Sequence, residues 1–293
     1  MSLNLIDGDE YFTIDHPGFG DFLVVKSDKL DYFINLINSK KIKSIGISSS
    51  KGYDTSNLDF LKECPEIEKI YTVGDGYELQ SLNYLKHLTF ISTASNIEQV
   101  DFSNFPQLSY CCINWGKNVL NLDKCKNLQH LRIYKYKSLQ NNLTQLPLFG
   151  ELKILELVSS SILTLNGIEK YALLTDFKGY YLSKLESIKA ITGLKALASL
   201  ILENCKKIKD FEELRVNQSL IKLILSDCGD IKSIGFIRGL KNLDFFTFVG
   251  TNVVDGDMTP CVGLGYFAFT NRKNYSHTMD EVKAKILKKD RPV

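Results

Sequence analysis

The chain has 293 residues, of which 44% are hydrophobic, and a formal net charge of +2 from 36 basic and 34 acidic residues. This near-neutral balance lacks the basic footprint of nucleic-acid-binding and membrane-surface proteins, so we expect neither nucleic acid nor a membrane as a partner. The seven cysteines form no CxxC pair and the N-terminus has no segment typical of a secretory signal, which predicts a reduced, cytoplasmic protein.

Residues 1–41 form a predicted N-terminal cap. Within it, FGDFLVV (residues 19–25) has the apolar run of a strand. Ser27 has the position of a helix N-cap, and apolar side chains recur at helical spacing from Leu30 to Ile37. About forty residues are few for an independent catalytic domain. We therefore expect one strand followed by an amphipathic helix.

Beyond residue 41 the sequence repeats itself. Residues 200–208 read LILENCKKI and residues 223–231 read LILSDCGDI, 23 residues further on. Both belong to the pattern Leu-x-x-Leu-x-Leu, which recurs at an average interval of about 22 residues. The pattern predicts repeats that begin at Ile42, Ile67, Leu85, Leu108, Leu128, Leu152, Leu174, Leu197, Leu220, Leu243 and Leu264.

Each repeat predicts one short strand. The Leu-x-Leu that ends the pattern alternates with period two, as a half-buried strand does. Such a strand is unstable alone, but stacked copies pair edge to edge as a parallel sheet and bury one continuous core. The connection back to the next strand is too short for a full α-helix, which favours 3₁₀ or extended returns.

This pattern resembles that of leucine-rich repeat proteins. The stretch GLKALASLILENCKKIKDFEEL (residues 193–214) is similar to the short, 22-residue-repeat class found in internalins and phosphatase-regulating repeat proteins. The resemblance implies an α/β solenoid: a curved array of about 10–11 repeats over residues 42–271. It would have a parallel sheet on its concave face, mainly 3₁₀ or extended returns, and a cap at each end.

The resemblance also assigns a place to several cysteines. In the family pattern, Asn or Cys stands eight positions after the first leucine, where the chain turns out of the strand. Cys205 and Cys228 hold this place in adjacent repeats. We expect buried turn thiols here rather than a redox or metal pair, whereas Cys112 is predicted to face the open side of the sheet.

Residues 272–293 form a predicted C-terminal cap. The sequence TMDE (residues 278–281) is a capping box, in which Thr278 and Glu281 satisfy each other's backbone donors. Val282 and Ile286 follow four residues apart, which predicts a short closing helix.

Side chains at positions three, five and seven of each repeat are predicted to face solvent on the concave sheet. These columns gather residue types that are enriched at binding hot spots. The alternative is that aromatic side chains on a solvated sheet only pack against each other and brace neighbouring strands. The predicted protein-binding residues are Tyr110, Asn114, Trp115, His130, Arg132, Tyr134, Glu156, Lys178, Tyr180, Tyr181, Ile201, Ile224 and Phe245.

No serine or cysteine hydrolase motif occurs. His87 and His130 are expected in one column, two strands apart, without an acidic ligand beside them. We therefore predict a non-enzymatic scaffold without cofactor or metal, whose partner is a protein. Family analogy suggests a bacterial immunity-type inhibitor of a toxin or a regulatory adaptor. The alternatives are an enzyme with a small site at an irregular turn, or a purely structural assembly protein.

Overall fold

The structure is a computed structural model that describes residues 2–6, 9–16, 19–93 and 99–289. The chain forms two compact units, residues 1–134 and 135–293, which we call the first and the second unit.

Among the described residues of the first unit, eight strands form one sheet. β2 pairs antiparallel with β1 on one side and with β3 on the other, and the pairs from β3–β4 onward are parallel. The strands are β1 (Ser2–Ile6), β2 (Asp9–His16), β3 (Gly20–Val25), β4 (Ser44–Ser48), β5 (Lys69–Val73), β6 (Phe90–Thr93), β8 (Tyr110–Asn114) and β10 (His130–Tyr134).

The connections of the first unit contain one α-helix, a small second sheet and short 3₁₀ helices. Helix α1 (Leu30–Lys40) buries Phe33, Leu36 and Ile37. The second sheet pairs β7 (Val100–Asp101) with β9 (Val119–Leu120). The 3₁₀ helices are Ser27–Lys29, Ser49–Lys51, Asp59–Glu63, Leu79–Tyr84, Phe102–Asn104 and Leu122–Lys124.

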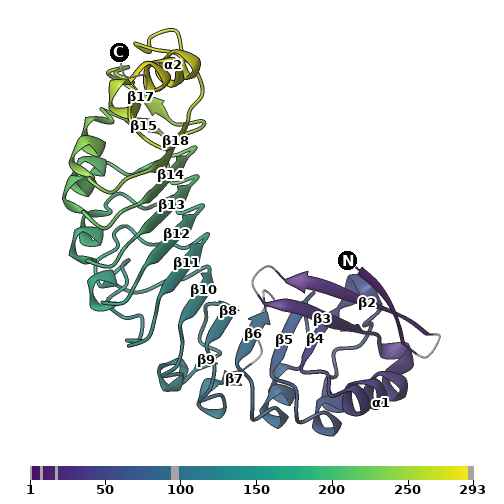
Figure 1. The fold of residues 1–293 in the computed structure, drawn as a ribbon. Coiled ribbons are helices and arrows are strands. Elements are labelled where there is room, and N and C mark those ends of the chain that lie inside the picture. The colour runs from purple at the N-terminus through teal and green to yellow at the C-terminus, as the bar shows by residue number, and fades with distance from the viewer. Residues whose placement is uncertain (1, 7–8, 17–18, 94–98, 290–293) are drawn as a thin grey trace. The chain divides into compact units, whose positions relative to one another are not determined.

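The second unit has six parallel strands in its sheet and ends in a helix, as far as it is described. Figure 1 shows β11 to β14 side by side, with helical turns along one side of them. The elements are β11 (Ile154–Val158), β12 (Asp176–Tyr180), β13 (Ser199–Glu203), β14 (Lys222–Ser226), β16 (Phe245–Thr247), β18 (Tyr266–Ala268), a small sheet of β15 (Asp230–Ile231) and β17 (Asn252–Val253), helix α2 (Met279–Lys289), and 3₁₀ helices at Ile168–Lys170, Lys189–Gly193, Phe211–Val216, Gly235–Gly239 and Thr259–Cys261.

The core of each unit lies between its sheet and its returns. Positions one, four and six of the repeat point into it: Leu197, Leu200 and Leu202 are all fully buried. Leu200 lies in register with Phe177 on one side and Leu223 on the other, so equivalent side chains stack from strand to strand. The predicted parallel array with 3₁₀ returns is confirmed.

One predicted repeat start is wrong. Phe90 of β6 lies in register with Tyr110, and Ile91 with Cys111, so this repeat begins at Leu88 and not at Leu85. Leu85 instead follows a 3₁₀ helix, with its backbone N–H bonded to the Leu82 carbonyl. The leucine-rich sequence offers two frames three residues apart, and burial of Leu88 and Ile91 together with the pairing of β6 selects the later one.

The region around α1 differs from the sequence prediction in two respects. The predicted N-cap role of Ser27 is wrong, because its hydroxyl accepts from the Asp54 N–H at 2.9 Å and α1 begins at Leu30. The hydroxyl thereby fixes the turn after β4 rather than the helix end. The antiparallel strands β1 and β2 were not predicted either, since residues 2–16 mix polar and apolar types without a clear repeat.

At the other end, the predicted capping box is confirmed. The Thr278 N–H donates to Glu281 Oε2 at 2.7 Å, and the Glu281 N–H donates to Thr278 Oγ1 at 3.3 Å. Val282 of α2 is buried, while the side chain of Ile286 lies outside the described residues. The division into an N-terminal cap, repeats and a C-terminal cap stays a prediction.

Candidate functional site

The predicted solvent-facing columns are real columns of the sheet. In the first unit Tyr110, Cys112 and Asn114 lie in register with His130, Arg132 and Tyr134. In the second unit the middle column runs through Glu156, Lys178, Ile201, Ile224, Thr247 and Ala268. We call the side of each sheet that carries these columns, opposite to the returns, its outer face.

Much of the outer face of the first unit is buried. Five residues of it, which we call the aromatic cluster, pack together with Phe19 and Tyr134 against them. Tyr110 is only 5% exposed and Cys112 only 4%, so their predicted accessibility is wrong. Phe19, just before β3, lies over this face and excludes solvent from it. The aromatic cluster consists of Phe22, Tyr71, Phe90, Tyr110 and Cys112.

The other predicted residues of the first unit are half-buried and contact one another. The Arg132 guanidinium lies 5.2 Å from the centroid of the Tyr134 ring. The backbone N–H of Trp115 donates to the Tyr134 carbonyl at 2.8 Å, and His130 meets Tyr110 edge-on. Asn114 is also half-buried. In this unit the aromatic side chains therefore brace neighbouring strands, as the alternative interpretation expects.

One charged pair on the second unit is less accessible than predicted. Glu156 is only 4% exposed, and its Oε1 accepts a hydrogen bond from Lys178 Nζ at 3.0 Å. The predicted exposure of Glu156 is therefore wrong, although its column is correct. Lys178, on the neighbouring strand, keeps part of its side chain in solvent.

Apolar side chains remain accessible elsewhere on the outer face of the second unit. Ile201 and Ile224 are neighbours in register and half-buried. Phe245 stacks on Tyr266 with centroids 4.5 Å apart, and the Lys222 ammonium lies 5.0 Å from the Phe245 centroid. We define the open face as these five residues with Tyr180 and Tyr181.

Sequence reasoning missed two of these residues. Tyr266 is 52% exposed and stands at position three of the repeat that begins at Leu264. The column that contains Phe245 reaches Tyr266 on the next strand, so the repeat pattern contained the signal for this residue. Lys222 is likewise at position three, and the contact of its ammonium with an aromatic ring in the next repeat gives it a place on the open face.

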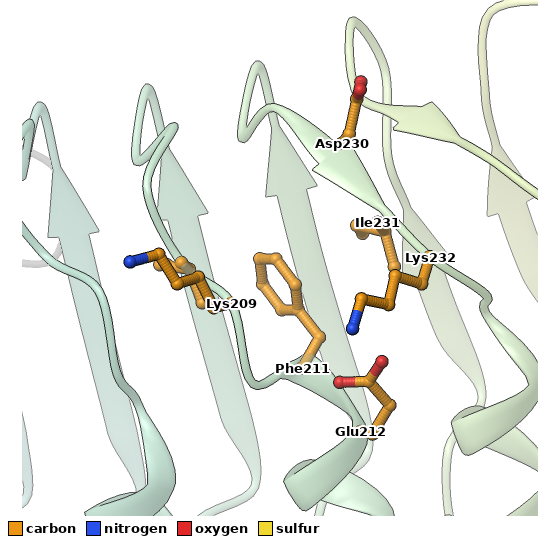
Figure 2. A pocket seen from close by; sticks show the side chains of 7 residues that line it. Lys209, Phe211, Glu212, Asp230, Ile231 and Lys232 are labelled. Atoms are coloured by element: carbon orange, nitrogen blue, oxygen red, sulfur yellow. The ribbon is translucent and has the colours of Figure 1, made fainter.

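A separate hollow of about 280 Å³ lies on the return side of the second unit. Figure 2 shows Phe211 and Ile231 in this pocket, with Lys232 directed toward the side of Glu212. Lys209 at its rim is already paired with Glu186 at 2.6 Å, and the Asp230 carboxylate accepts from Asn252. Two of the four charged residues that line the pocket are thus already engaged within the chain.

Comparison with known proteins identifies the fold. No family model matches the chain. The structure of an internalin from Listeria monocytogenes is similar, with a TM-score of 0.58 and 17% sequence identity. The similarity covers 82% of this chain and 71% of the internalin chain. The chain has the leucine-rich repeat fold. A leucine-rich repeat protein from Leptospira interrogans covers 85% of this chain and 88% of its own, at 14% identity and a TM-score of 0.35.

One curated protein is similar in sequence. It is a disease resistance protein from Arabidopsis thaliana, 35% identical over 136 residues. The match covers 42% of this chain, and the chain spans only 11% of the length of that protein. In the described part of this chain, no helix combines the length and apolar character needed to cross a membrane.

In the second unit, the side chain at the turn position bonds the backbone after β11, β13, β14 and β16, whereas Leu182 holds this position after β12. Cys205 and Cys228 are buried, as predicted. The Cys228 thiol donates to the Leu202 carbonyl at 3.2 Å, and Thr251 bonds the Leu225 carbonyl in the same way. No group of three or more potential metal ligands occurs among the described residues. The two thiols bond backbone carbonyls of the preceding repeat and so stabilise the turn.

The residue just before this turn position is left-handed in successive leucine-rich repeats. Lys135, Ser159, Asn204 and Asp227 have φ values of 56°, 49°, 57° and 51°, and Gly250 has 74°. Small, Asn and Asp residues tolerate this conformation best. Tyr181 occupies the same place with φ 56° and is 54% exposed. A bulky, exposed side chain at such a position is costly and therefore needs another explanation.

Proposed function

We propose that the chain is a non-enzymatic scaffold that binds a protein partner through the open face of the second unit. The observation that carries this proposal is the side-by-side arrangement of Ile201, Ile224, Phe245 and Tyr266, none of which is fully buried. Aromatic rings are enriched at binding hot spots, and they bury a large area with little loss of side-chain freedom. Lys222 adds a cation beside the rings.

The strained conformation of Tyr181 supports the same proposal. The two following repeats place Asn204 and Asp227 in the equivalent left-handed position, whereas the first such position of the second unit holds Lys135. Tyr181 is 54% exposed, so a large part of this residue remains accessible to a partner. A contact with a partner would offset the backbone strain, which is the pattern found at functional sites.

A narrower form of the proposal is an immunity-type inhibitor or a regulatory adaptor. It rests on resemblance alone. The matched relative is named a disease resistance protein, and the chain spans only 11% of the length of that protein. The open face has no constellation of nucleophile, base and oxyanion donors, so binding explains it better than catalysis does.

The test compares matched variants of both sides of the second unit. Proteins captured from the native host by the parent chain are identified, and their affinities are then measured with purified components. We expect Ile224→Lys to lower the affinity for the true partner by about 30-fold or more. Lys209→Ala, on the return side, should leave the affinity unchanged.

Two results would contradict the proposal. A partner that tolerates Ile224→Lys but is lost with Lys209→Ala binds the return side. If sedimentation of the purified chain shows a dimer that Ile224→Lys abolishes, the open face joins two copies of this chain instead of binding another protein.

A further inference from the structure

Phe19 contacts the outer face of the first unit with both its ring and its main chain. Its ring centroid lies 4.7 Å from that of Phe90 and 4.6 Å from that of Tyr110. Its carbonyl oxygen accepts a hydrogen bond from Lys69 Nζ at 3.0 Å. One residue thus supplies an aromatic ring and a main-chain acceptor to side chains at least 50 positions away in the sequence.

The receiving surface is preorganised. Phe90 and Tyr110 stack with centroids 4.2 Å apart and an interplanar angle of 7°, and the Phe19 ring is inclined to them by 58° and 62°. His130 neighbours Tyr110 on the side away from Phe90, with its ring centroid 6.4 Å from that of Phe19. Edge-to-face contacts of this kind favour an aromatic occupant over an aliphatic one of equal size.

Gly20 allows the chain to reach this surface. Its φ of +81° is a conformation that residues with a Cβ rarely adopt, and no heavy atom lies within 4 Å of the place where a Cβ would stand. Backbone conformation and not crowding therefore requires glycine. The ring of Phe19 remains half-buried, whereas all five residues beneath it are buried, so Phe19 is the outermost layer.

We propose that the aromatic cluster together with Lys69 is a binding site for an aromatic residue of a peptide segment, and that the chain fills this site with its own Phe19. The stacked pair selects a ring, and the Lys69 ammonium selects a carbonyl of the same residue. A partner segment binds by taking the place of Phe19, whose own contact lowers the apparent affinity of the site. This inference is independent of the open face of the second unit.

Cys112 provides a reporter within the full chain. It lies in the aromatic cluster and is buried, so a disulfide-exchange reagent reaches it only when the cover opens. Labelling is followed residue by residue by mass spectrometry. We expect Phe19→Ala to accelerate modification of Cys112 by about tenfold or more. Phe245→Ala, which removes the same side chain from the outer face of the second unit, should leave that rate unchanged.

N-acetyl-phenylalaninamide serves as the ligand probe, because it carries one ring and amide carbonyls. At about 10 mM it should slow the labelling of Cys112 in Phe19→Ala roughly threefold or more, while N-acetyl-leucinamide should not. Unchanged labelling of Cys112 in Phe19→Ala would overturn the covering role. Labelling that neither compound slows, or that both slow equally, would overturn the aromatic site.

Gly20→Ala keeps the ring and strains only its approach. It replaces Phe19→Ala if circular dichroism shows that Phe19→Ala is unfolded. We expect this variant to label Cys112 about two- to fivefold faster than the parent, with the same protection by the phenylalanine compound. Labelling at the parent rate in a folded Gly20→Ala chain would overturn the proposal.

Discussion

Lys178 Nζ and Glu156 Oε1 are 3.0 Å apart at the same register of the adjacent strands β12 and β11. The carboxylate is almost fully buried, and Lys178 supplies it with a positively charged hydrogen-bond donor. We expect Lys178→Met to lower the free energy of unfolding by about 3 kcal/mol, because it removes this ammonium from a buried carboxylate. Adding Glu156→Gln should restore most of the loss in urea denaturation. A double variant no more stable than Lys178→Met would contradict this account.

Tyr181→Asn should raise the free energy of unfolding by about 1 kcal/mol, because asparagine tolerates the left-handed backbone better than tyrosine does. The matched control is the reverse exchange one repeat later, Asn204→Tyr, which should destabilise by a similar amount. Denaturant titrations of both variants check the pair. The same Tyr181→Asn change should weaken binding of a partner captured through the open face, so stability and affinity should move in opposite directions.

Leu200 and Ile201 are neighbours in sequence on opposite sides of the sheet. Leu200 is fully buried and Ile201 half-buried. Leu200→Ala should cost about 3 kcal/mol of stability through the cavity that it leaves, whereas Ile201→Ala should cost less than about 1 kcal/mol. Equal losses in equilibrium unfolding would show that the repeat register is wrong.

The Tyr71 hydroxyl is buried and has no hydrogen-bond partner among the described residues. Tyr71→Phe should therefore raise the stability at pH 7 by about 1 kcal/mol. Tyr266→Phe alters an exposed ring and should change stability at this pH by much less. A loss of stability in Tyr71→Phe would show that the hydroxyl has a favourable interaction.

The difference in stability between the parent and Tyr71→Phe should increase at alkaline pH. Desolvation by burial raises the pKa of Tyr71 to about 12, above the value of about 10 expected in the unfolded chain. Between these values the unfolded phenol loses its proton while the folded one keeps it. The contribution of Tyr71 is thus fully present below pH 10 and is lost as the pH rises toward 12. The stability difference between Tyr71→Phe and the parent should widen over this range.

The repeating part of the fold could be predicted from the sequence because period and burial agree there. Within each unit, the strand pairs from Leu108 onward have the predicted register, as Leu200 with Leu223 shows. The misplaced repeat at Leu85 arose because Leu85 and Leu88 both fit the pattern. As a consequence the prediction that His87 shares a column with His130 is wrong, because Phe90 holds this place in the sheet.

The site was harder to predict. The alternation of residues along a strand shows which face of the sheet a side chain is on, but not whether another segment packs over that face. Tyr110 points to the outer face as predicted, yet Phe19, far away in sequence, lies over it. Glu156 also points outward, and its burial comes from neighbours that no repeat pattern specifies. Exposure of Ile224 and Phe245 was predicted correctly, since no described segment covers them completely.

Each strand in the sheet of the second unit pairs only with those of adjacent repeats. Unfolding that begins at β18 must therefore reach β16 before it reaches β14, as in a linear array of units that contact only their neighbours. Loss of order should start at the terminal strand and advance one repeat at a time. Amide deuterium exchange should consequently show protection that declines in steps from β13 to β18, a gradient that a two-state globular domain would not produce.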